Sequence, residues 1–173
     1  MKHPNRLRAV LSVLLCAALL SAAGAAFGEA EYATTREFLN YCDENAIFAE
    51  YEGIYSTSKR EAVCLVFQNE AFGNIECVFL FDGSENSASL CLWDLLTVSP
   101  QKTDEALSLC NRLNHTYRYC KVSMDPQTRT VSMDADLTLT ADTGTVGDQC
   151  YRYLVGMLQT VTQVIGDLRA LEE

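Results

Sequence analysis

From Thr130 on, residues 129–139 alternate strictly between polar and apolar side chains, the pattern of a β-strand that buries one face and exposes the other to water. The segment before them, 118–125, carries apolar residues at every second position, and a turn with Pro126 at its second position joins the two. Together they predict an antiparallel hairpin with one face in water. The alternating residues are Thr130, Val131, Ser132, Met133, Asp134, Ala135, Asp136, Leu137, Thr138 and Leu139.

Further strand-like runs precede this hairpin. They cover residues 61–68, 75–81 and 89–97, and short turn signals containing Gly with Asn or Asp separate them. The stretch 51–56 is either a short first strand or a lead-in to these runs. Turns at such short intervals predict an antiparallel meander.

Two segments before residue 120 have helical periodicity. The first helix is expected over about 35–46, with Thr34 as N-cap and Glu37 in the third position of a capping box. The second begins at Ser99-Pro100, with Ser as N-cap and Pro in the first helical position, and runs to about His115.

The last helix is the longest amphipathic element. Thr145 is expected to cap it, Asp148 follows three residues later, and apolar residues recur at steps of three and four up to Leu171. The resulting order is α-β-β-β-α-β-β-α. Since strands and helices do not alternate strictly, the sequence predicts an α+β fold with an antiparallel sheet and helices on one face.

The first 28 residues have the three parts of a secretory signal peptide. Lys2, Arg6 and Arg8 form the basic start, an apolar run covers 7–20, and small residues fill 21–28. The apolar run is short, because a transmembrane helix needs about 20 residues. We expect cleavage after position 25 or 28, a single mature domain from about residue 29 to 173 without a membrane span, and a periplasmic, cell-envelope or extracellular location. An uncleaved anchor is the alternative.

The mature chain is strongly acidic. The whole chain has a formal charge of −10, and loss of the three basic residues of the signal makes this −13. Nucleic-acid binding requires basic patches, and anionic membrane surfaces attract basic segments. Both kinds of partner are therefore disfavoured.

No catalytic motif stands out. His115 is the one histidine left after removal of the signal, and no patterned nucleophile accompanies it, so we interpret it as an exposed residue near a helix end. Asp134 and Asp136 belong to the wet face of one strand and lack the rest of a calcium loop. No cofactor, metal or catalytic residue is expected.

Seven cysteines remain after the signal, and they fall on apolar faces of the expected elements. We interpret them as small buried hydrophobic residues, with one or two disulfides as the alternative. Zinc binding has little support, because no C-x-x-C or Cys/His cluster is present. They are Cys42, Cys64, Cys77, Cys91, Cys110, Cys120 and Cys150.

Four tyrosines are interface candidates. Tyr117 and Tyr119 follow the second helix, and Tyr151 and Tyr153 lie in the third. Helical residues two positions apart cannot share a face, so one of Tyr151 and Tyr153 should point outward. An exposed tyrosine suits an interface, whereas packing at the edge of the core is the alternative.

The C-terminal half resembles the YbjN domain family. The residues that carry the resemblance are Leu107-Ser108-Leu109-Cys110-Asn111-Arg112-Leu113-Asn114, Arg118-Tyr119-Cys120-Lys121-Val122-Ser123-Met124-Asp125, the strand at 131–139, and Thr143-Gly144-Thr145-Val146-Gly147-Asp148 before the long helix.

The resemblance implies a fold like that of type III secretion chaperones, whose members are small, acidic and often dimeric and hold extended segments of client proteins. It also implies a role in sensory regulation and no enzymatic activity. Family members are mostly cytosolic, whereas this chain starts with an export signal. Asn111, Asn114 and Arg118 mark a structural corner in this pattern, where Asn side chains can satisfy backbone groups.

The sequence therefore favours an exported binding module that is not an enzyme and that receives a protein segment or a second copy of itself. A secreted structural or surface protein without a specific client is the alternative.

Overall fold

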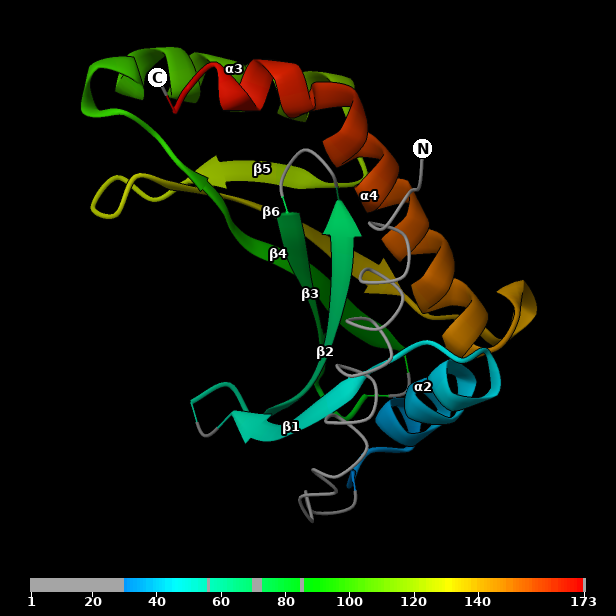
Figure 1. The fold of residues 1–173 in the computed structure, drawn as a ribbon. Helices are drawn as coiled ribbons and strands as arrows, with labels where there is room; N and C mark the ends of the chain where they lie inside the picture. The colour runs from blue at the N-terminus through cyan, green and yellow to red at the C-terminus, as the bar shows by residue number, and fades with distance from the viewer. Residues whose placement is uncertain (1–29, 56, 70–72, 85, 173) are drawn as a thin grey trace, which may run out of the picture.

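The computed structural model describes residues 30–55, 57–69, 73–84 and 86–172, so the expected signal peptide lies outside the described part (Figure 1). Three α-helices and six strands make up this described part. They are α2 (Ala33–Glu44), β1 (Glu50–Tyr55), β2 (Arg60–Asn69), β3 (Gly73–Phe81), β4 (Ser87–Thr97), α3 (Thr103–Thr116), β5 (Lys121–Met124), β6 (Thr130–Thr138) and α4 (Val146–Arg169).

The six strands form one antiparallel sheet in the order β1-β2-β3-β4-β6-β5. The α+β class and the antiparallel sheet predicted from the sequence are confirmed. The expected order of elements needs one correction, because the stretch at 50–55 is a full strand paired with β2. Four strands therefore precede α3, instead of three.

The helices cover one face of the sheet, as predicted from the order of strands and helices in the sequence. Figure 1 shows α2 and α4 along one side of the sheet and α3 across one end. Side chains from all three helices join the inward-facing strand residues in one apolar core. Its largest fully buried members include Phe38, Phe79, Phe81, Leu90, Met133, Leu137 and Leu154. No helix among the described residues is long and apolar enough to span a membrane.

The start of α2 differs from the sequence prediction. The N-cap is Tyr32, and Thr34 lies inside the first turn with its side chain buried. The buried carboxylate of Glu61 on β2 instead accepts hydrogen bonds from the backbone N–H groups of Glu31 and Tyr32. A side chain distant in sequence thus holds the chain just before the helix, so a local capping box is not needed.

Of the two other predicted helix starts, that of α4 is confirmed in full and that of α3 only in part. Thr145 and Asp148 form the predicted capping box of α4, each side chain bonding the other residue's backbone N–H. Ser99 is the N-cap of a 3₁₀ turn with Pro100 in its first position, as predicted, but its side chain makes no capping hydrogen bond. Its hydroxyl donates to the Gln101 side chain, residues Pro100–Lys102 form a 3₁₀ turn, and α3 begins only at Thr103.

Candidate binding face

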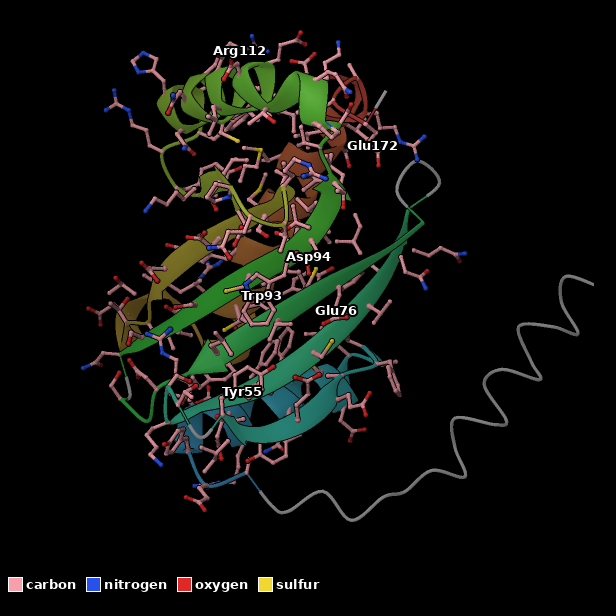
Figure 2. All side chains as sticks on the ribbon, turned by 90° about the vertical axis from the view of Figure 1, so that its left-hand side faces the viewer. Tyr55, Glu76, Trp93, Asp94, Arg112 and Glu172 are labelled. Atoms are coloured by element: carbon pink, nitrogen blue, oxygen red, sulfur yellow. The ribbon has the colours of Figure 1, made fainter. Side chains whose placement is uncertain are left out.

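The face of the sheet that points away from the helices carries a second, smaller apolar cluster. We call it the open face. Its central residues have between 0% and 8% exposure, although α2 and α4 lie behind the sheet in the view of Figure 2. The cluster consists of Ala62, Cys64, Val78, Leu80 and Cys91, with Tyr55 packed against it.

Exposed apolar and acidic side chains surround this cluster. Trp93 on β4 is 41% exposed and Val66 on β2 is 53% exposed. Figure 2 looks onto this face, with Trp93, Asp94 and Glu76 labelled near its middle. The strand register places the carboxylates of Glu50, Glu76, Asp134 and Asp136 on the open face, and Figure 2 labels Asp94 there. The Glu52 carboxylate lies beside Cys64 and Glu76.

A notch in the sheet lies beside Trp93. Strands β3 and β4 pair only over residues 78–81 and 88–91, so residues 73–77 and 92–96 have no strand partner on the sides that face each other. At the same place β4 is irregular, because its register against β6 shifts between Leu92 and Leu96 and Asp94 has a φ of 50°. Such a bulge bends its strand away from the neighbouring strand.

The notch holds a cavity of about 290 Å³. The backbone N–H of Asp94 donates to the Ser132 hydroxyl on β6 over 3.2 Å, which ties the bulge to the neighbouring strand. The notch therefore combines free strand edges, an exposed indole and acidic side chains. Its lining residues are Asn74, Ile75, Glu76, Trp93, Asp94 and Leu95.

The predicted corner residues separate in the structure. Asn114 at the end of α3 donates from Nδ2 to the Val122 carbonyl over 2.9 Å, and its Oδ1 accepts from the Val122 N–H over 2.6 Å. Asn111 is exposed on α3, and Arg118 is exposed in the loop that follows. Asn114 alone among the three joins α3 to β5 by these two bonds.

Three of the four candidate tyrosines lie close together. The rings of Tyr117 and Tyr119 meet edge to face at 6.4 Å, and Tyr119 lines a shallow cleft together with Tyr153. The Tyr119 hydroxyl donates to the Gly156 carbonyl of α4 over 3.1 Å. These contacts fasten the loop after α3 to α4.

Tyr151 lies apart from the other three, with its ring against that of Tyr41 on α2 at 6.1 Å. It is 39% exposed, whereas Tyr153 packs against the core. Of the pair in α4, Tyr151 is thus the residue that points outward.

His115 is exposed in the last turn of α3, as the sequence indicates. Asp134 faces the open side, as expected for the wet face of β6. Burial raises the pKa of its carboxyl, nearby Lys121 opposes this effect, and Asp136 adds to it. All seven cysteines from Cys42 to Cys150 are buried free thiols, in agreement with their interpretation as small hydrophobic residues.

Sequence reasoning did not single out Trp93, Asp94 or Glu76. One signal was available: Trp93 is the single tryptophan of the chain, and a strand over 89–97 places it on the same face as Cys91. No sequence pattern indicates the notch, because it forms where strands β3 and β4 separate.

The model of one protein family, described as "Putative bacterial sensory transduction regulator", matches residues 69–169. This chain belongs to the YbjN family. The matched residues run from the end of β2 to the last residue of α4, so they include the notch, the Asn114 corner and the tyrosine contacts with α4. The resemblance seen in the sequence is confirmed.

Among solved structures, the chain is similar to one described as "YbjN, a putative transcription regulator from E. coli". The identity is 13%, the alignment covers 79% of this chain and 91% of that chain, and the TM-score is 0.48. No curated protein matches the chain.

Proposed function

We propose that this YbjN protein is an exported binding module, without enzymatic activity, that holds an extended basic segment of another protein against its open face. The observation that carries the proposal is the notch, where two free strand edges lie beside the exposed indole of Trp93.

The backbone at the notch suits a segment in β conformation. Residues 92–96 of β4 and 73–77 of β3 each leave one edge without a strand partner. An added strand gains affinity from main-chain hydrogen bonds, and alternate side chains give selectivity. Every second side chain of the guest would lie on the open face beside Trp93, the exposed apolar residue that lines the notch.

Charge gives the expected chemistry of the guest. Glu76 and Asp94 line the notch, and neither takes part in the salt bridges found among the described residues, which join Lys102 to Glu105 and Arg112 to Asp167. Lys or Arg side chains on the guest would complement these carboxylates. Electrostatic complementarity of this kind favours association with basic partners and rejects acidic ones.

The fluorescence of Trp93 offers a direct test, because it is the single tryptophan of the chain. The protein is titrated with a peptide of alternating Val and Lys, and separately with one of alternating Val and Glu. We expect a blue shift and saturation with the Lys peptide, weakened by salt, and no response to the Glu peptide. An equal response to both peptides, or to neither, contradicts the proposal.

A matched pair of variants then locates the site with a labelled Lys peptide. Trp93→Ala should weaken binding at least tenfold, whereas Tyr151→Ala removes an aromatic side chain of similar exposure from the helical side and should leave binding unchanged.

Export is the second part of the proposal. It is supported by the way the domain begins, because Ala30 is buried and the N–H groups of Glu31 and Tyr32 bond to Glu61, just after the expected cleavage point. Mass spectrometry of the native protein should find an N-terminus at Ala26 or Glu29. An intact Met1 in the cytosolic fraction contradicts export.

Self-association through disulfides would favour the alternative, a secreted structural or surface protein without a specific client, but the seven cysteines give this no support. All of them are buried, and none is paired.

A further inference from the structure

A mixed group of one thiol and two carboxylates lies on the open face, toward β1. Glu52 on β1, Cys64 on β2 and Glu76 on β3 each offer one ligand atom, and these atoms all lie within 4.8 Å of one another. Three adjacent strands thus contribute one residue each. The group is separate from the apolar contacts of Trp93, although Glu76 also lines the notch.

The strand register explains how the group forms. Cys64 lies opposite Val78 on β3, and Glu76 is two residues before Val78 and hence on the same face. On β1, a register shift between Tyr51 and Gly53 inserts Glu52 as an extra residue. A bulge of this kind re-aims a side chain, and here the Tyr55 hydroxyl donates to Glu52 Oε2 over 2.8 Å.

The electrostatic environment of Cys64 favours a cation. The residue is only 8% exposed, and neither Glu52 nor Glu76 takes part in a salt bridge found among the described residues. Burial raises the pKa of the Cys64 thiol to about 12, with further contributions from Glu76, Glu52 and Glu50. Carboxylates placed on both sides of a buried thiol repel one another, and a bound cation would turn this repulsion into attraction.

We propose that Glu52, Cys64 and Glu76 bind a divalent metal ion of the zinc type, with water in the fourth position. Thiolate, imidazole and carboxylate are the ligands that zinc takes in proteins, whereas calcium and magnesium require oxygen ligands alone. In a tetrahedral zinc site, bonds of about 2.3 Å to sulfur and 2.0–2.2 Å to oxygen place the ligand atoms about 3.5 Å apart. Since both glutamates are exposed, rotation of their side chains can close the remaining gap.

Binding has a defined proton balance. The S–H bond of Cys64 breaks, its proton passes to solvent, and the sulfur electron pair forms the bond to the metal as bound water leaves. Because burial raises the pKa of the Cys64 thiol, the thiol carries its proton at neutral pH, and one proton is released for each metal bound. The apparent affinity should therefore rise about tenfold for each pH unit between pH 6 and 7.5.

Cobalt(II) serves as the probe, because it takes zinc-type sites and its bond to a thiolate absorbs in the near ultraviolet. The reduced, metal-free full chain is titrated with Co²⁺ alone, and Zn²⁺ is then added as competitor. We expect a saturable thiolate-to-metal band that Zn²⁺ abolishes. Absence of this band overturns the proposal.

Two variants locate the metal. Cys64→Ala should remove the band, whereas Cys91→Ala, which removes the other buried thiol of the open face, should retain it. A band that survives in Cys64→Ala overturns the proposal. Glu76 is exposed, so Glu76→Gln should fold normally and weaken Co²⁺ binding at least tenfold, and unchanged binding in this variant also overturns it.

The proposal of a metal site and the proposal of a guest segment can be tested independently of each other. Cys64→Ala should leave binding of the Lys peptide unchanged, and Trp93→Ala should leave the cobalt band unchanged.

Discussion

Glu37 of α2 accepts a hydrogen bond from the backbone N–H of Val146, the first residue of α4, over 2.9 Å. The two residues are 109 positions apart in the chain. The carboxylate thus satisfies one of the free N–H groups at the start of α4 and places negative charge at the positive end of its dipole. A residue expected to cap its own helix therefore joins two helices.

Replacement of Glu37 should measure this contact. Glu37→Ala should lower the free energy of unfolding by about 1 kcal/mol, which is typical of a lost N-terminal cap. Glu44→Ala, at the other end of the same helix, should change it by less than about 0.5 kcal/mol, as for ordinary surface positions. Urea unfolding of both variants gives the comparison, and equal effects would show that Glu37 does not act through Val146.

Gly147 should tolerate no side chain. A Cβ atom there would overlap the Cβ and ring of Tyr41 on α2, where the two helices pack. Gly147→Ala should therefore destabilise the fold by about 1–3 kcal/mol, as overpacking does. Gly166→Ala in the same helix meets nothing within 4 Å and should stabilise by about 0.5–1 kcal/mol. Thermal unfolding should shift in opposite directions, and a harmless Gly147→Ala would contradict the packing of α2 on α4.

Asn114 should matter more than Asn111. Asn114→Ala removes both side-chain hydrogen bonds to Val122 and should cost about 1–3 kcal/mol, since it leaves backbone groups at the α3–β5 corner without partners. Asn111 is exposed, and Asn111→Ala should stay within about 0.5 kcal/mol. Chemical unfolding of the two variants tests this difference, which should vanish if the corner is held by packing alone.

The buried carboxyl of Glu61 should make the free energy of unfolding depend on pH in the acidic range. Burial alone would raise the pKa of its carboxyl, but the nearby hydroxyls of Thr35 and Tyr51 and the N–H groups of Glu31 and Tyr32 outweigh burial and lower it. A lowered pKa stabilises the fold above the unfolded value of about 4.3, and this contribution is lost as the pH falls through the folded value.

Glu61→Gln isolates that contribution. At pH 7 the variant should be less stable by about 1–3 kcal/mol, because in either orientation its NH2 group would face a backbone N–H donor, that of Glu31 or that of Tyr32. The difference from the unchanged protein should persist from pH 8 to 6 and shrink below about pH 4.3. Urea unfolding across this range checks the sign, and a difference that grows in acid would contradict it.

Local patterns predicted the parts of this fold that depend on neighbouring residues. The alternation at 129–139 gives β6 with its buried Val131 and Met133, and the Thr145–Asp148 box starts α4 as expected. The YbjN resemblance rested on the same C-terminal segments, which the family match includes.

Features made by contacts distant in sequence were missed. Thr34 and Glu37 have the spacing of a capping box, but Glu61 accepts from the N–H groups of Glu31 and Tyr32 before the helix, and Glu37 accepts from the N–H of Val146. The notch beside Trp93 depends on where β3 and β4 part, and the alternation of one strand does not encode the angle to its neighbour.

Hydrogen exchange at individual amides tests the central claim most directly, because it reports where a guest strand pairs. With the peptide of alternating Val and Lys bound, amide exchange should slow at residues 73–77 of β3 or 92–96 of β4, while α3 stays unchanged. Protection at the outer edges β1 or β5, or no protection at the notch at saturating peptide, would contradict the assignment of the open face as the binding site.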